Sequence, residues 1–232
     1  MSITNCYIPC EQVQISTHLY NLYIITFFVL NMPIVHGQEV GPIGYGLMGL
    51  TWHPSTQTTD DEKIAVMKAA LEAGATAWNG GDFYGPPENN SLTVLNKYFT
   101  KYPEDAKRVK SISIKSGYLP GGRVDNSPDF TQKSVENCLA QLEGKARLNM
   151  WQFGRRTTQG EYLDSLRVLD GFIKEGKIDG VSLSEINANT IRQAVKITKV
   201  AAVEVEISLI RHEVLTNGVA EACAEFGIPI FA

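Results

Sequence analysis

Short apolar runs alternate with segments of helical periodicity from about residue 41 to the end of the chain. The apolar runs have the length of strands, and we place strands at 41–50, 76–78, 109–114, 148–153, 178–183, 201–207 and 228–231. Strands separated by helices of about 10–15 residues form βαβ units, which build parallel sheets. The alternation therefore predicts an α/β protein with a parallel sheet.

Apolar stripes mark the helices between these strands. Thr59 and Glu62 can form a capping box before the first helix, and Gly74 ends that helix. Apolar side chains at helical spacing predict five more helices, near 92–99, 135–142, 162–173, 191–195 and 219–226.

The resulting count of seven strands and six helices is compatible with two α/β folds. A doubly wound sheet accommodates it directly, whereas a (β/α)8 barrel needs one more strand and two more helices. Gly44, Gly46 and Gly49 have the spacing Gly-x-Gly-x-x-Gly, but the Gly-rich segment 41–46 precedes a loop and not a helix. That context argues against a dinucleotide-binding Rossmann fold. Periodicity alone leaves an open sheet and an incomplete barrel as alternatives.

Composition excludes several classes of protein. The 232 residues carry a net charge of −4 and 44% of them are hydrophobic, which argues against general binding to nucleic acid or membranes. The four cysteines are too few for a disulfide scaffold, and Cys138 and Cys223 fall on apolar helix faces. The four histidines are scattered without metal-ligand spacing, so we expect no metal site.

Residues 1–33 differ from the rest of the chain. They contain no Lys or Arg, and their apolar run at 19–30 is shorter than the roughly 20 residues that span a membrane. A secretory signal would place basic residues before such a run. The segment is therefore either a signal or anchor or, as the sequence favours, a non-native extension before a domain at 34–232.

Candidate catalytic residues follow the predicted strands, where α/β folds place their sites. Tyr84 comes shortly after the second strand, and Lys115 follows the third. A nearby ammonium lowers the pKa of a tyrosine from about 10, which makes the phenol a usable acid for a developing alkoxide. The alternative is a loop tyrosine that packs against Pro86 and Pro87, beside a solvated lysine.

Charged residues also accompany two later strands. Glu204 and Glu206 share one face of the strand at 201–207, and a barrel would turn both carboxylates inward, where they need hydrogen-bond partners. Arg155 and Arg156 follow the strand at 148–153, either as an anion-binding pair or as a pair that faces solvent.

Three segments, 73–85, 175–185 and 201–208, resemble signatures of the aldo-keto reductase family. The first ends in Asn-Gly-Gly-Asp-Phe-Tyr-Gly, the second runs from Gly-Lys-Ile to Ser-Leu-Ser-Glu, and the third contains Val-Glu-Val-Glu. The resemblance covers about residues 34–232 and is strongest toward the pyridoxal reductase branch. It implies a (β/α)8 TIM barrel that is incomplete here, with about seven strands and six helices present.

The same resemblance implies NADPH-dependent reduction of a small aldehyde, pyridoxal to pyridoxine above all, in the cytoplasm. Tyr84 matches the family's proton donor and Lys115 the residue that tunes it. Asn79 stands where the family has Asp, and Gly154 stands where it has His. Because an amide can only accept a hydrogen bond from the ammonium, we expect Asn79→Asp to be tolerated or mildly activating.

Further residues carry over from the resemblance as ligand contacts. Substrate contacts are implied for Trp52 and Arg155. The implied cofactor contacts are Gly46, Leu47, Met48, Ser184, Glu185 and Glu204. The aromatic that stacks on the nicotinamide and the loop that holds the 2′-phosphate would follow Ala232, so we expect a truncated chain with little activity of its own. The alternative is an inactive pseudo-reductase or a binding protein.

Overall fold

The computed structural model describes residues 32–52, 58–157 and 159–232, so the apolar run at 19–30 and nearly all of the predicted extension lie outside the described residues. Seven described strands form one sheet, in the order β11-β10-β9-β8-β5-β4-β3. They are β3 (Tyr45–Gly46), β4 (Ala77–Gly81), β5 (Ser111–Ser116), β8 (Met150–Phe153), β9 (Gly180–Ser184), β10 (Val200–Glu204) and β11 (Ile230–Phe231). Every neighbouring pair is parallel.

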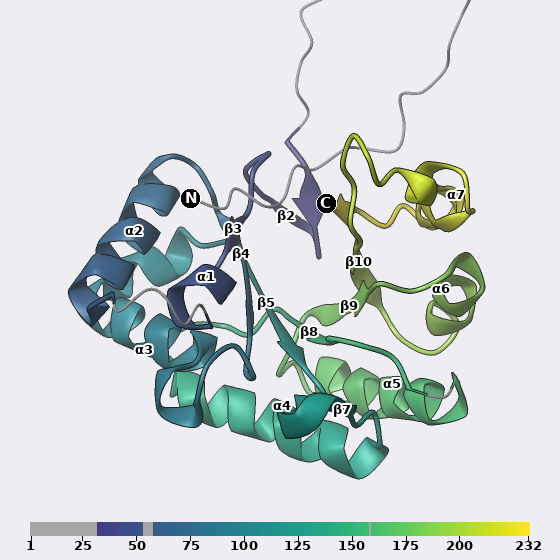
Figure 1. Cartoon of the computed structure of the whole chain (residues 1–232), viewed down its shortest axis with the longest axis horizontal. Helices are drawn as coiled ribbons and strands as arrows, with labels where there is room; N and C mark the ends of the chain where they lie inside the picture. The colour runs from purple at the N-terminus through teal and green to yellow at the C-terminus, as the bar shows by residue number, and fades with distance from the viewer. Residues whose placement is uncertain (1–31, 53–57, 158) are drawn as a thin grey trace, which may run out of the picture.

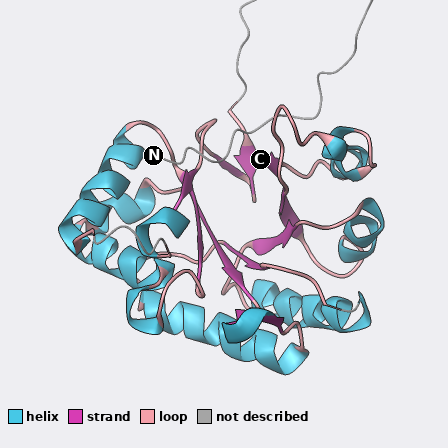
Figure 2. Cartoon of the chain, viewed as in Figure 1, coloured by secondary structure: helices cyan, strands magenta, loops and turns pink. Residues whose placement is uncertain are grey.

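The spatial order of the strands follows the chain without reversal. A doubly wound sheet reverses its order at a switch point. This sheet instead runs in one direction and curls, with the helices along its outer side (Figure 1 and Figure 2). The prediction of an incomplete (β/α)8 barrel is confirmed, and β3 and β11 are the two edges of the sheet.

Six helices longer than one turn lie in the described chain. They are α2 (Asp60–Glu72), α3 (Ser91–Lys101), α4 (Pro128–Leu142), α5 (Gln159–Lys174), α6 (Ala188–Ala194) and α7 (Val219–Glu225). The predicted capping box of α2 is present, since the Glu62 N–H donates to the Thr59 hydroxyl at 3.3 Å and the Thr59 N–H donates to the Glu62 carboxylate at 2.8 Å. A one-turn helix, α1 (Met48–Thr51), stands where the sequence pattern predicted a strand that runs into a loop.

The two faces of the sheet bury different side chains because successive residues of a strand point to opposite sides. Large outer residues such as Trp78, Ile114 and Trp151 join the main core with the helices. A smaller inner core lies at the amino ends of the strands and contains Val35, Val40, Ala77, Met150, Ala201 and Ala202. A hairpin of β1 (Ile34–Val35) and β2 (Gln38–Glu39) contributes to it. The amino end of the barrel is therefore filled by apolar side chains.

Several boundaries differ from the sequence prediction. Asn79 and Lys115 lie inside β4 and β5 rather than after or at the end of them. A second hairpin, β6 (Tyr118–Leu119) with β7 (Arg123–Val124), was not predicted, because strands of two residues show no periodicity.

Four short 3-10 helices complete the described elements: η1 (Pro87–Asn89), η2 (Pro103–Lys107), η3 (Pro120–Gly122) and η4 (Glu213–Leu215). No helix of the described ranges is both long and apolar enough to cross a bilayer.

Candidate active site

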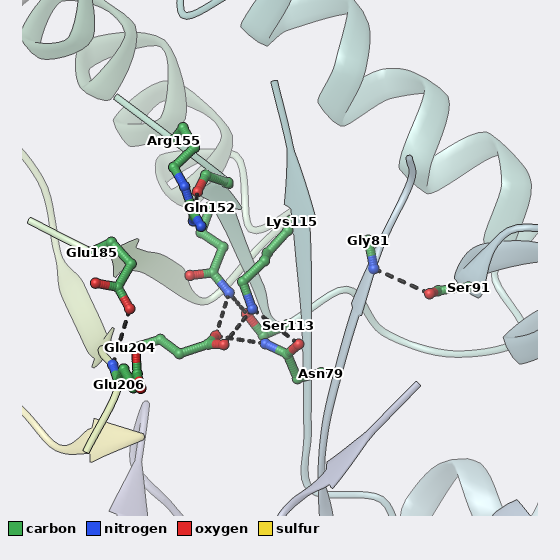
Figure 3. A network of polar contacts seen from close by, with 11 residues as sticks. Asn79, Gly81, Ser91, Ser113, Lys115, Gln152, Arg155, Glu185, Glu204 and Glu206 are labelled. Atoms are coloured by element: carbon green, nitrogen blue, oxygen red, sulfur yellow. Dashed lines mark hydrogen bonds and ion pairs between the residues drawn. The ribbon is translucent and has the colours of Figure 1, made fainter. Parts of the chain in front are cut away.

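A cluster of polar side chains fills the inner face of the sheet toward the carboxyl ends of the strands. It consists of Asn79 on β4, Ser113 and Lys115 on β5, Gln152 on β8 and Glu204 on β10. Ser113 and Lys115 alternate with the outward Ile112 and Ile114, which belong to the main core. Figure 3 shows the five side chains converging on one another from four strands.

Three of these side chains form a closed triangle. The Lys115 ammonium pairs with the Glu204 carboxylate and donates a hydrogen bond to Asn79 Oδ1 at 3.1 Å. Asn79 Nδ2 in turn donates to Glu204 Oε2 at 2.6 Å. The Lys115 and Glu204 side chains are 9% and 19% exposed, so this ion pair is largely removed from water. The amide of Asn79 orients the ammonium as expected, but the negative charge comes from Glu204.

Gln152 supports the triangle and was missed by the sequence analysis. Its Nε2 donates to Glu204 Oε2 at 2.9 Å and to Ser113 Oγ at 3.2 Å. Gln152 is completely buried, and its Oε1 has no partner among the described residues. A single Gln in the apolar run 148–153 was the available signal, because alternation places it opposite Trp151 and Phe153.

Tyr84 lies in the turn after β4, close to this cluster. The turn is tied to the neighbouring strand, since the Asp82 N–H donates to the Lys115 carbonyl at 2.9 Å. The Tyr84 ring stacks on Trp52 with a centroid separation of 5.1 Å, and Tyr84 is 7% exposed. Gly85 follows with φ of +101°, where an added Cβ would lie 2.4 Å from the Asn89 carbonyl oxygen, so only glycine fits this turn. Tyr84 is thus held in one orientation.

The pKa of Tyr84 is raised above its ordinary value, mainly by burial and secondly by the Glu204 carboxylate, while Arg155 opposes the rise. From the sequence we expect an ammonium to lower this pKa. In the structure, burial outweighs the effect of the surrounding charges on the pKa of Tyr84. Tyr84 therefore stays a protonated phenol at neutral pH.

Gly154 stands where the resemblance implies a His, and it has no side-chain hydrogen-bond donor. A Cβ at Gly154 would lie 3.0 Å from Cζ of Phe83, whose ring covers this position. The exposed Arg155 folds back, and its Nη1 donates to the Gly154 carbonyl at 2.7 Å. The ring of Phe83, packed edge-on against Trp52, makes this wall of the site apolar.

The other residues implied as cofactor contacts differ in how accessible they are. Gly46 pairs in register with Asn79, and Met48 is half exposed at the start of α1. Leu47 is completely buried in the main core, so only its backbone remains for a ligand. Glu185, beyond the end of β9, accepts a hydrogen bond from the Glu206 N–H at 3.0 Å, and Glu206 itself is exposed rather than turned inward.

The resemblance implies cofactor contacts at the carboxyl edge of the sheet, and only some polar groups there are available to a ligand. The Ser184 hydroxyl lies on β9 and forms no hydrogen bond to another described group, so it can bind an amide. Gln152 Oε1 is a second unused acceptor in the same cluster. The Glu204 carboxylate, by contrast, already accepts from Lys115, Asn79 and Gln152. Of the residues that the resemblance implies as cofactor contacts, Ser184 and Met48 have side chains that are still available to a ligand. In residues 32–52, 58–157 and 159–232, no three His, Cys, Asp or Glu side chains group as metal ligands do.

A cavity of about 580 Å³ is lined by Phe83 and Gly85, the residues before and after Tyr84, but not by Tyr84 itself. Its wall includes Trp52, Tyr118 and Asp82, and Asp82 accepts hydrogen bonds from Ser116 at 2.5 Å and Ser134 at 3.2 Å. Burial raises the pKa of Asp82 to about 6, despite these two hydroxyl donors. Asp82 lies in the candidate segment 79–85 of the sequence, which by itself assigns no role to this carboxylate.

Asp82→Asn is expected to stabilise the fold more at pH 8 than at pH 5. The folded state favours protonated Asp82, because its pKa there lies above that in the unfolded state. The free energy of unfolding of the wild-type chain therefore falls by about 2–3 kcal/mol as the pH rises from about 4 to above 6. Asn keeps an oxygen acceptor for both serines and carries no charge. Urea unfolding at the two pH values measures the gain. Asp164→Asn, at an exposed ion pair with Arg167, is the control and should show no comparable pH dependence.

Comparison with known proteins places this site in a family. A family model described as Aldo/keto reductase family matches residues 42–232. "Probable pyridoxal reductase 2" of Schizosaccharomyces pombe is 41% identical over 208 residues, covering 87% of this chain and 60% of the relative. "Putative pyridoxal reductase" of Saccharomyces cerevisiae is 37% identical over 204 residues, covering 81% of this chain and 57% of the relative.

The chain thus spans about 60% of the length of these relatives. A crystal structure described as the putative aldo-keto reductase from Pseudomonas aeruginosa superposes with a TM-score of 0.71 at 22% identity, covering 87% of this chain and 76% of that one. This likeness supports the fold alone. With the family model matched over nearly all of the barrel, the chain belongs to the aldo/keto reductase family.

Proposed function

We propose that the protein containing this chain reduces a small aldehyde with NADPH, and that pyridoxal is its substrate. The observation that carries the proposal is the Lys115 ammonium, held by Asn79 and Glu204 on the inner face of β5, with the buried Tyr84 in the turn after the neighbouring strand β4. The similarity to two proteins named pyridoxal reductases supports the choice of substrate.

NADPH, when bound, would supply a hydride to the carbonyl carbon. The phenol of Tyr84 donates its proton to the carbonyl oxygen as negative charge develops there. Lys115 lies on the neighbouring strand and favours the phenolate that remains after proton transfer. Trp52 and Phe83 pack against Tyr84 and give the aldehyde an apolar wall. Such a wall excludes water and strengthens the electrostatic contacts inside the site.

An assay of NADPH consumption with pyridoxal tests the proposal. It uses the 232-residue chain and, in parallel, a form extended at Ala232 with the corresponding last part of the S. pombe relative. Because the chain spans 60% of that relative, we expect turnover by the extended form and little by the chain alone. A folded extended form that binds NADPH without oxidising it would favour the alternative, an inactive pseudo-reductase or binding protein.

Robust turnover by the 232-residue chain would show that the described residues hold the cofactor without further segments. That result would contradict the expected role of the remaining segment, while leaving the assignment of Tyr84 open to its own test.

A further inference from the structure

The Lys115 ammonium needs a negative charge, and the strand that carries Asn79 does not provide it. An ammonium with 9% side-chain exposure is costly to bury unless it is paired and hydrogen-bonded. Asn79 offers only a neutral carbonyl oxygen, at 3.1 Å. The one carboxylate in contact with Lys115 within the described chain is Glu204, on the opposite side of the barrel interior.

The Glu204 carboxylate is committed to this role by its other contacts. Oε1 pairs with Lys115, while Oε2 accepts from Asn79 at 2.6 Å and from Gln152 at 2.9 Å (Figure 3). Three donors on three different strands fix both oxygens. A carboxylate held in this way faces the ammonium and has little remaining capacity for another ligand.

We infer that Glu204 is a positioning residue that supplies the counter-charge of Lys115, and that Asn79 and Glu204 act as one amide–carboxylate pair. The inference rests on the proposed function only for its catalytic consequence. It has a specific corollary, because the amide and the carboxylate contact each other and share one ammonium. A carboxylate at either position 79 or position 204 should serve as the counter-charge of Lys115, provided that the other position carries an amide.

The two single changes should each be harmful. Glu204→Gln leaves the buried ammonium between two neutral amides. Asn79→Asp removes the Nδ2 donor that lies 2.6 Å from Glu204 Oε2 and puts a second carboxylate in its place. Two negative charges then compete for one ammonium. This reverses the expectation from the sequence that Asn79→Asp is tolerated, because Lys115 already has a charged partner.

The exchange variant Asn79→Asp/Glu204→Gln should be restored. An Asp at 79 can accept from Lys115, and a Gln at 204 can donate to that Asp as Asn79 now donates to Glu204. The number of charges and of donors in the triangle is unchanged. Restoration by the second change is a result that two independent defects would not give.

The first test is thermal unfolding of the chain without NADPH. Each single variant should lower the unfolding midpoint at pH 7, and the exchange variant should recover most of the loss. Glu206→Gln is the matched control, since it removes the same charge from an exposed residue two positions away, and it should leave the midpoint unchanged. Additive losses in the exchange variant, or no loss in Glu204→Gln, would overturn the inference. Because this test needs no activity, it stands even if the proposed reaction fails.

The second test is steady-state kinetics of the extended form with pyridoxal and NADPH. Glu204→Gln should lower kcat about tenfold or more, with the KM for NADPH nearly unchanged, and Asn79→Asp in the same chain should restore kcat. A raised KM for NADPH with unchanged kcat would overturn the inference, because it would make Glu204 a cofactor ligand.

Discussion

Tyr84→Phe is expected to lower the rate of the chemical step by about 10²–10⁴-fold. The change keeps the ring that stacks on Trp52 and packs against Phe83, and it deletes only the hydroxyl. Gly154 has no side chain that could supply a proton in its place. Single-turnover oxidation of NADPH by the extended form measures the effect, with the thermal midpoint as a check on folding.

Tyr162→Phe provides the matched control. Tyr162 is another buried tyrosine whose pKa is raised by burial, but it lies on α5 and packs against Phe153 in the main core. Its loss of a hydroxyl should leave the rate of NADPH oxidation within about twofold. If Tyr84→Phe and Tyr162→Phe behaved alike, Tyr84 would not be the proton donor.

Lys115→Met should have the second large effect, and it should act on both activity and stability. The rate of aldehyde reduction should fall because the phenolate of Tyr84 loses its stabilising charge. The free energy of unfolding should fall by about 3–5 kcal/mol, since Glu204 becomes a largely buried carboxylate without an ion-pair partner. Urea unfolding of the 232-residue chain measures the second effect directly.

The double variant Lys115→Met/Glu204→Gln separates the two effects. It removes the ammonium and its counter-charge together, so most of the lost stability should return. Activity should not return, because the charge near Tyr84 is still missing. Recovery of activity with stability would show that Lys115 has only a structural role.

Much of the barrel was predictable from the sequence because the pattern is local. Alternation of strands and helices gave the seven parallel strands, and the capping box at Thr59 and Glu62 is present as predicted. Single turns and two-residue strands were not predictable. The one-turn helix α1 and the two hairpins are too short for any period, so the Gly-rich segment before α1 was read as leading to a loop.

Several residues of the site were predictable from the sequence, but Gln152 and the contacts between the side chains were not. The sequence placed Lys115 and Asn79 at neighbouring strands and turned Glu204 inward, yet it assigned Lys115 no charged partner. Asn79 and Glu204 are 125 residues apart, and only the curl of the sheet brings β10 opposite β4 and β5. Burial of Leu47 and the raised pKa of Tyr84 likewise depend on packing from distant elements.

Hydride transfer to an aldehyde with proton donation by Tyr84 is tested most directly with NADPH that carries deuterium at its transferable position. The label is followed by mass spectrometry of the alcohol formed from pyridoxal. We expect one deuterium on the former carbonyl carbon with the extended form, and loss of nearly all labelled product in Tyr84→Phe. An unlabelled alcohol, or undiminished labelling in Tyr84→Phe, would contradict it.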